Sequence, residues 1–255
     1  MDSKVLDNIT EQCNFLLKNF PIAQACKEYL DSRLDANTQD FFKFGYFPDY
    51  ANISALNSLI GNDTLVDNKL CYHKNMDDSM GSRSIQFSFF ENYPLIMPFK
   101  DVYGEIIALV GRTLASEKQR EVLKIPKYKN TIFTKGNHLF GLFENKKQIL
   151  KQDFVYIVEG QFDVIKAHEK NMRNVVALGS SNMSGKQFAL LCRYTNNIFL
   201  LLDNDEAGTK GRERIIKKFG NKANIRNFYL PDQYKDIDEF FVSNTLEDLR
   251  LSTSI

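Results

Sequence analysis

From residue 154 to residue 230 the chain alternates short apolar runs with longer segments that mix apolar and polar residues. An unbroken apolar run predicts a strand buried on both faces, whereas apolar positions three or four apart predict a helix. The segments, strand first and then alternating, are FVYIVEG, QFDVIKAHEKN, NVVAL, SGKQFALLCRY, NIFLLLD, EAGTKGRERIIKKFG and NIRNFYL. Strict alternation of this kind predicts a parallel sheet with helices on both faces.

The first half of the chain is patterned differently. Residues 1–55 have apolar positions at helical spacing, most clearly in ITEQCNFLLKNF and IAQACKEYLDSRL. A third short helix is expected over QDFFKFG, capped by Asn37 or Thr38 and closed by Gly45. Residues 84–114 contain the β-rich segments SIQFSFF, YPLIMPF and EIIALVGRTL, and the DVYG between the last two indicates a hairpin turn. These segments predict a small antiparallel sheet.

Together these patterns predict an α/β protein of two domains. We expect an α+β domain over 1–150 and a domain built on the parallel sheet over 151–255, with the boundary near NKKQILKQD. A length of 255 residues with 43% hydrophobic residues suits that size of core.

The composition limits where the protein works and which metals it uses. The sequence has no apolar run long enough to span a bilayer and no N-terminal signal pattern, so a cytoplasmic protein without a membrane partner is expected. The cysteines are far apart and form no C-x-x-C pair, so we expect reduced thiols and no zinc. They are Cys13, Cys26, Cys71 and Cys192.

Acidic residues follow two of the predicted parallel strands. Glu159 comes after YIV, and Asp203 and Asp205 come after FLLL. Functional groups of an open parallel sheet gather at the carboxyl ends of its strands, so these carboxylates are expected on one edge. They would repel one another without a cation, and oxygen ligands suit Mg²⁺ or Mn²⁺. The sequence therefore predicts a site for divalent metal ions.

A further acidic group follows the last strand, in LPDQYKDIDEFF. Asp236, Asp238 and Glu239 surround a predicted helix start, where acidic side chains also serve as helix caps. Two other families with acidic strand ends fit less well. A phosphoryl-aspartate hydrolase needs Ser or Thr soon after its Asp-x-Asp, and a receiver domain needs an acidic pair after the first strand, where this chain has Glu-Gly.

A basic band lies between residues 112 and 151. It contains ten Lys or Arg residues against three Glu residues, although the whole chain has a net charge of +1. Such a band attracts polyanions, and a solvated lysine-rich surface is the alternative interpretation.

The two acidic segments resemble the Toprim domain of bacterial-type DNA primases, topoisomerases and some nucleases. Its Glu-Gly and Asp-x-Asp signatures are similar to IVEGQFD and LLLDNDEAG. Upstream segments resemble the primases in particular: YL-x-x-R followed by GYFPD, IMPFKDVYGEIIALVGRTL, and PKYKNTIFTKGNHLFGL. The correspondence covers roughly residues 20–240 and identifies the chain as similar to a primase catalytic core.

This resemblance implies template-dependent synthesis of short RNA primers on single-stranded DNA from ribonucleoside triphosphates, by two-metal nucleotidyl transfer. It implies that Glu159, Asp203 and Asp205 bind the catalytic Mg²⁺ or Mn²⁺ ions, with Asp163, Asp236 and Asp238 in support. It also implies nucleotide and nucleic-acid contacts by the following residues of the basic band: Arg112, Lys127, Tyr128, Asn130 and Lys135.

The chain also departs from the family pattern. Bacterial primases begin with a zinc-binding domain and end with a helicase-binding domain, and neither is recognisable here. We expect a phage or mobile-element version, with a replicative helicase or a separate zinc-domain polypeptide as partner. The alternatives are a Toprim nuclease or topoisomerase-like enzyme that cleaves phosphodiesters, and a catalytically silent DNA-binding replisome protein. The intact carboxylates argue against the silent protein.

Overall fold

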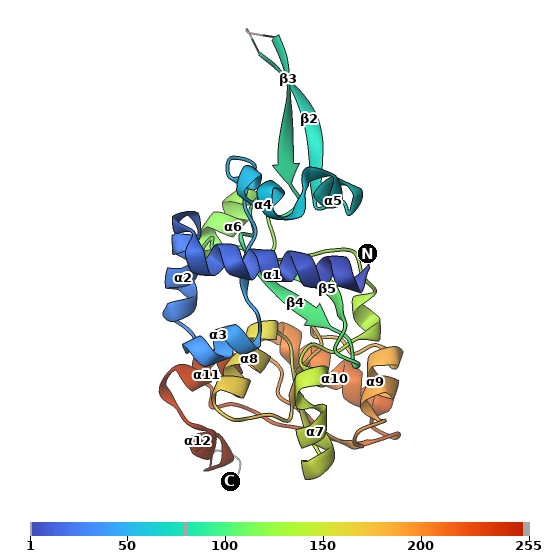
Figure 1. Ribbon diagram of the computed structural model, residues 1–255. Coiled ribbons are helices and arrows are strands. Elements are labelled where there is room, and N and C mark those ends of the chain that lie inside the picture. Colours follow the sequence, from blue (N-terminus) through green and yellow to red (C-terminus); the bar gives the residue numbers. More distant parts are fainter. Residues whose placement is uncertain (1, 79–80, 252–255) are drawn as a thin grey trace. The chain divides into compact units, whose positions relative to one another are not determined.

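The computed structural model describes residues 2–78 and 81–251 (Figure 1). The chain divides into two compact units, the first formed by 1–99 with 106–133 and the second by 100–105 with 134–255. This division lies earlier in the sequence than the expected domain boundary at 150. The reason is that Phe140 exchanges backbone hydrogen bonds with Ala177 of the parallel sheet, which ties the preceding segment to the second unit.

Unit 1 combines helices with an antiparallel sheet. Its helical elements are α1 (Ser3–Asn19), η1 (Pro21–Ala23), α2 (Gln24–Asp31), α3 (Ala36–Phe41), α4 (Ile53–Ile60), α5 (Asn62–Asp67) and α6 (Glu117–Leu123). Its strands are β1 (Gly45–Tyr46), β2 (Cys71–Asp78), β3 (Gly81–Ser88), β4 (Leu95–Lys100), β5 (Ile106–Arg112) and β6 (Tyr128–Asn130). The main sheet has the order β1-β4-β5-β6, and the long helix α1 packs against β1 and β5.

The expected third helix exists, but its cap was predicted wrongly. The helix α3 begins at Ala36, because the Asp35 carboxylate accepts the N–H of Thr38 at 2.7 Å. Neither Asn37 nor Thr38 is the cap. Gly45 does not close the helix either, since it lies in β1, where an added Cβ would come within 2.7 Å of the Cys13 Cβ on α1.

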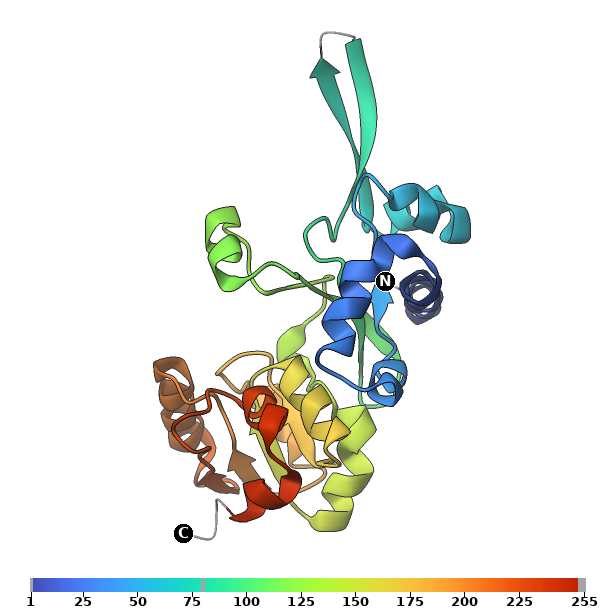
Figure 2. The same cartoon turned by 90° about the vertical axis from the view of Figure 1, so that its left-hand side faces the viewer.

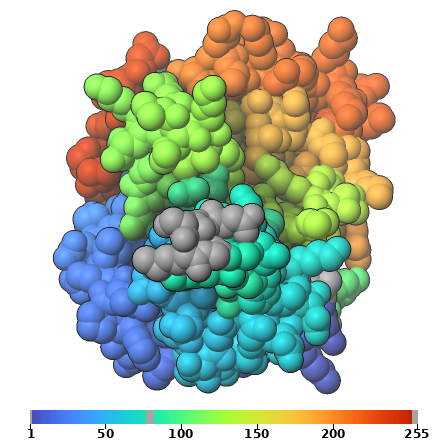
Figure 3. All heavy atoms as spheres, turned by 90° about the horizontal axis from the view of Figure 1, so that it is seen from above, coloured from blue at the N-terminus to red at the C-terminus, as the bar shows by residue number. Residues whose placement is uncertain are grey.

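The hairpin of β2 and β3 extends away from the rest of unit 1 (Figures 1 and 2). Its base is aromatic, because the Tyr72 ring stacks on its cross-strand partner Phe87 at 5.7 Å and Tyr50 lies 5.5 Å from the same ring. The helix α6 also extends outward, and none of its described side chains is buried (Figure 2). Seen along the hairpin, α6 forms a bright green lobe of its own (Figure 3).

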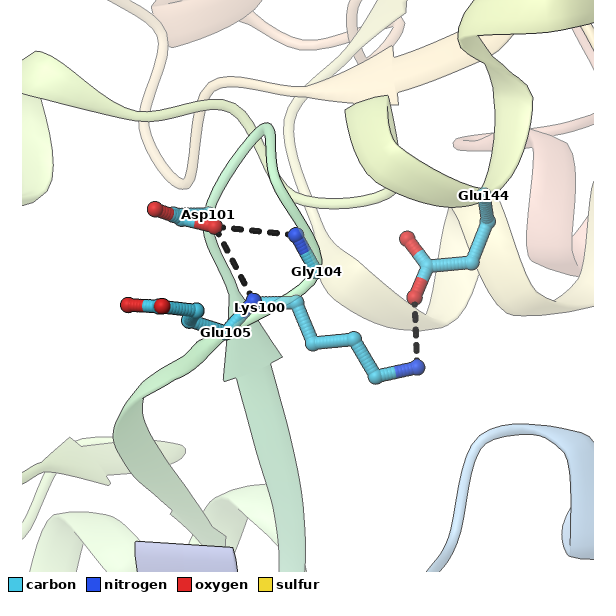
Figure 4. A network of polar contacts seen from close by, with 5 residues as sticks. All are labelled: Lys100, Asp101, Gly104, Glu105 and Glu144. Carbon is cyan, nitrogen blue, oxygen red and sulfur yellow. Dashed lines mark hydrogen bonds and ion pairs between the residues drawn. The ribbon is translucent and has the colours of Figure 1, made fainter. Parts of the chain in front are cut away.

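The DVYG segment forms the predicted turn between β4 and β5. The Asp101 carboxylate accepts the N–H groups of Tyr103, Gly104 and Glu105, and Gly104 has the positive φ of 99° that this turn requires. An ion pair of 3.1 Å between Lys100 and Glu144 joins the turn to helix α7 (Leu142–Gln152) (Figure 4). The pair is mostly buried, so the turn is anchored within unit 2.

Unit 2 contains the predicted parallel sheet. Its strands are β7 (Val155–Val158), β8 (Val175–Ala177), β9 (Asn197–Leu200) and β10 (Asn224–Asn227), paired in parallel in the order β10-β9-β7-β8. Its helical elements are η2 (Lys135–Asn137), α7 (Leu142–Gln152), α8 (Gln161–Glu169), α9 (Gly185–Leu191), α10 (Glu206–Phe219), α11 (Ile237–Ser243) and α12 (Leu246–Leu251). The α/β prediction is thus confirmed.

The helices of unit 2 cover both faces of this sheet. On one face the strands contribute Ile157, Ile198 and Leu200 to a core that also contains the stacked rings of Phe188 (α9) and Phe219 (α10), 4.2 Å apart. On the other side α8 packs against β8, and α11 packs against α8. No helix among the described residues is sufficiently long and apolar to cross a bilayer.

We predict that Gly111→Ala lowers the free energy of unfolding by about 1–3 kcal/mol, as overpacking typically does. A Cβ at Gly111 would overlap the Phe90 ring and come within 2.9 Å of the Tyr93 Cβ. Gly185→Ala is the matched control, because a Cβ there meets nothing within 4 Å. Urea denaturation of both variants measures the difference, and equal stabilities would contradict the packing argument.

Candidate functional site

The acidic residues that follow β7 and β9 lie at one edge of the parallel sheet. β7 and β9 are direct neighbours, with Ile157 opposite Leu200, so Glu159 and Asp203 leave the sheet side by side. Burial, followed by the charges of Asp203 and Asp205, raises the pKa of Glu159 to about 7. The structure therefore brings together the three residues that sequence analysis selected.

One carboxylate oxygen of Glu159 is available to bind a cation. Its Oε1 atom is buried and has no hydrogen-bond partner among the described residues. A buried carboxylate oxygen without a partner is costly, and a metal ion would satisfy it. A divalent cation would also relieve the repulsion by Asp203 and Asp205, which adds to the effect of burial on the pKa of Glu159.

Several hydrogen bonds hold the segment from Leu202 to Asp205 in place. Asn204 donates its N–H to the Lys235 carbonyl at 2.7 Å, and its side-chain amide donates to the carbonyls of Leu230 and Tyr234 at 3.1 and 3.0 Å. Helix α10 begins at once, because the Asp205 carboxylate accepts the N–H of Gly208 at 2.8 Å.

The position of Gly208 requires a glycine. A Cβ at this residue would collide with the Asp203 carbonyl oxygen. The backbone of Asp203 and the first turn of α10 are therefore in close contact, and the two aspartates are presented from a fixed loop.

A second acidic group adjoins the first. Asp163 is buried in the first turn of α8, where its carboxylate accepts the Gly160 N–H at 2.8 Å. Burial, together with Asp236, Asp203 and Asp238, raises its pKa well above the usual range. Asp236 also caps α11 by accepting the Glu239 N–H at 2.8 Å, so the capping role considered for it is present.

The carboxylates do not converge tightly enough to form a closed metal cage. Within residues 2–78 and 81–251, no three Asp, Glu, His or Cys side chains are placed to hold one ion together. Mg²⁺ does not need such a cage, since it is usually held by one or two carboxylates and completes its shell with water and phosphate oxygens. The donor set and the unsatisfied Glu159 oxygen therefore fit Mg²⁺ or Mn²⁺.

Four of the basic-band residues lie in unit 1, in or beside its sheet. Arg112 at the end of β5 is paired with Tyr128 of β6, and its guanidinium donates to the Tyr128 hydroxyl and lies 5.3 Å from the ring centre. The Lys127 ammonium lies 5.6 Å from the same ring. Asn130 is the last residue of β6. Arg112, Lys127 and Tyr128 thus form one cluster of cations and an aromatic ring.

Two further residues of this cluster were not predicted from the sequence. The Arg112 guanidinium also lies 5.1 Å from the ring centre of Tyr29 on α2, and Arg33 lies 5.5 Å from that ring. Both residues belong to the YL-x-x-R segment, which was noted as a family pattern but given no role. Cations alternating with aromatic rings suit a ligand that carries phosphates and bases.

Lys135 belongs to unit 2 and not to this cluster. Its ammonium donates to the Gly179 carbonyl, and the Gly179 N–H donates to the Glu159 carbonyl at 2.8 Å. Burial lowers the pKa of Lys135. The lysine therefore lies at the same sheet edge as the carboxylates.

Two family profiles match the chain. Residues 16–146 match the family described as DNA primase catalytic core, N-terminal domain, and residues 156–241 match the family described as Toprim-like. The DNA primase of Aquifex aeolicus (strain VF5) is 28% identical over 251 residues, which cover 98% of this chain and 48% of that protein. The chain spans about half the length, or less, of the curated relatives it matches.

Solved structures have the same fold. The Aquifex aeolicus primase, with zinc-binding and RNA polymerase domains, has a TM-score of 0.74 and 29% identity, covering 98% of this chain and 61% of that one. A primase catalytic domain bound to single-stranded DNA has a TM-score of 0.73 and 23% identity, covering 98% and 79%.

We predict a pH dependence of stability that comes from Glu159. Between about pH 4.5 and 7 the folded chain holds a proton on this carboxyl that the unfolded chain has released, so raising the pH favours unfolding. Without divalent ions, the unfolding midpoint of the wild type relative to Glu159→Gln should therefore fall as pH rises through this window. Scanning calorimetry at several pH values measures the difference.

The Glu159→Gln variant serves as the control for the wild type, because glutamine has nearly the same shape as glutamate and does not titrate. Mg²⁺ added at about pH 8 should raise the wild-type midpoint more than that of the variant. A difference that stays constant across the window would show that Glu159 titrates normally.

Proposed function

Because this chain belongs to the DNA primase catalytic-core family, we propose that it synthesises short RNA primers on single-stranded DNA by metal-dependent nucleotidyl transfer. The observation that carries the proposal is the acidic sheet edge, where Glu159, Asp203 and Asp205 interact in a chain whose first half matches the primase profile. A solved domain of the same fold is bound to single-stranded DNA, which supports the choice of template.

The carboxylates provide the metal-binding part of the mechanism. When bound, Mg²⁺ or Mn²⁺ supplies Lewis-acid chemistry for the attacking 3′-hydroxyl and for the departing pyrophosphate. Glu159 and Asp203 would hold the ion on the hydroxyl side, and Asp203 with Asp205 the ion on the triphosphate side. Asp163 and Asp236 would support them by binding the Gly160 N–H and by capping α11, and Asp238 would add negative charge near Asp163.

The cations provide the binding of substrate. Lys135 donates to the carbonyl of Gly179, whose N–H donates to the Glu159 backbone, and it would neutralise part of the charge of a triphosphate at that edge. In unit 1, the cluster of Arg112, Lys127 and Tyr128 offers charge for phosphates and a ring for stacking, with Asn130 at the end of the same strand. These residues would bind ribonucleoside triphosphates and the template.

Other activities receive less support. A Toprim nuclease or topoisomerase-like enzyme would use the same carboxylates, but the match of residues 16–146 to the primase profile favours primer synthesis. We extend the proposal to a cytoplasmic protein that works with a replicative helicase.

We predict that the purified chain incorporates labelled ribonucleotides into oligomers on a single-stranded DNA template only when Mg²⁺ or Mn²⁺ is present. Asp203→Asn should reduce the rate at least about 100-fold, because it removes a negative charge from the metal edge without changing its shape. Glu247→Gln on the exposed face of α12 removes the same charge elsewhere and should leave the rate unchanged.

One outcome would contradict the proposed primer synthesis. A wild-type chain that forms no oligomers in excess Mn²⁺, yet cuts DNA in a manner that depends on Asp205, would be a nuclease.

A further inference from the structure

Helix α10 contains a buried arginine that neither the family resemblance nor the metal scheme accounts for. The Arg212 side chain is only 2% exposed, which is unusual for a guanidinium. Its Nη1 donates to the Asp203 carbonyl at 3.0 Å and its Nη2 donates to the Leu202 carbonyl. The burial lowers its pKa. Placing a charge here is costly, so the contacts it makes deserve a functional explanation.

The two carbonyls belong to the segment that presents the metal carboxylates. β9 ends at Leu200, so the carbonyls of Leu202 and Asp203 lie beyond the strand. Arg212 gives each of these carbonyls a donor. The Asp203 carbonyl is also in close contact with Gly208, so α10 fixes it from two positions. The direction in which the Asp203 side chain leaves the backbone depends on this arrangement.

The charge of Arg212 acts on the same residues. Glu159, Asp203 and Asp205 all interact electrostatically with the guanidinium, and Arg212 in turn favours the ionised form of Glu159. The Tyr229 ring, which follows β10, lies 4.8 Å from the guanidinium carbon on another side. The cation is therefore placed among the carboxylates and partly shielded by an aromatic ring.

We propose that Arg212 is a positioning residue for the metal-binding edge. By binding the carbonyls of Leu202 and Asp203 with a rigid fork, it fixes the segment that carries Asp203 and Asp205. Its charge meanwhile offsets the mutual repulsion of the carboxylates before a metal ion arrives. This inference rests on the proposed role of the edge in binding divalent ions.

An arginine is required for this role, because a lysine cannot reproduce it. The guanidinium holds its donors in one plane, whereas the lysine ammonium is a point charge on a flexible stem. Arg212→Lys therefore keeps the charge and removes the fork. Any change in metal binding by this variant reports the geometry of the segment and not the loss of a charge.

The test measures the binding of Mn²⁺ to the full chain at neutral pH, with electron paramagnetic resonance as the readout. Arg212→Lys should weaken Mn²⁺ binding about 10-fold or more, as changes to residues that orient metal ligands commonly do. Arg226→Lys on β10 is the matched control, because it makes the same change at an exposed position and should bind Mn²⁺ as the wild type does. Thermal unfolding of each variant is measured in parallel.

A wild-type Mn²⁺ affinity in Arg212→Lys, with a lowered unfolding temperature, would make the residue a structural element only and would overturn the inference. If Arg212→Lys does not fold, Tyr229→Ala decides, since this ring is 58% exposed and its removal admits water to the guanidinium. We expect weaker Mn²⁺ binding there too, and an unchanged affinity would count against the inference.

The same measurement separates this inference from the proposed function. A wild-type chain that binds Mn²⁺ but makes no primers would refute primer synthesis. The Mn²⁺ affinities of Arg212→Lys and Arg226→Lys would still decide whether Arg212 positions the metal-binding edge. A wild-type chain that binds no Mn²⁺ would overturn the inference directly.

Discussion

Repulsion among carboxylates at one edge of the parallel sheet governs how unit 2 is built. Glu159 and Asp163 both have raised pKa values because they are buried and face other acidic groups. The fold tolerates this arrangement by surrounding it with compensating groups. The Arg212 guanidinium interacts with Glu159, Asp203 and Asp205, and the Lys235 ammonium lies 3.9 Å from the Asp205 carboxylate. A divalent ion would complete this compensation.

Helix N-termini take up several of the same acids. Asp163 lies in the first turn of α8, Asp205 caps α10 and Asp236 caps α11, and each accepts a backbone N–H with its carboxylate. A capping carboxylate is stabilised by the helix dipole and is held in a defined direction. Capping and metal binding are therefore compatible here, because a carboxylate has a second oxygen to offer. The structural role of these residues orients the groups that the proposed chemistry uses.

Unit 1 has a complementary chemistry. Its sheet and α2 bring Arg33, Tyr29, Arg112, Tyr128 and Lys127 into one alternating cluster of cations and rings. Antiparallel pairing of β5 with β6 places Arg112 directly opposite Tyr128. The cluster is thus a consequence of strand register, in the same way that the acidic edge of unit 2 is a consequence of parallel pairing. Each unit prepares one part of the proposed reaction.

Local patterns in the sequence were sufficient for the four strands and for α8, α9 and α10 of unit 2, for the DVYG turn and for the grouping of Glu159 with Asp203 and Asp205. Helix α7 was not predicted, because its segment was interpreted as a domain boundary. A buried parallel strand must be continuously apolar, and its carboxyl end has a fixed position in the sheet, so both can be read without coordinates. The polar strand β2 was missed because its residues show no such run. Folding decided which distant groups meet, namely Arg212 with the Asp203 carbonyl and Lys135 with the Gly179 carbonyl. Those contacts depend on how a helix or loop packs on the sheet, which residue spacing does not encode.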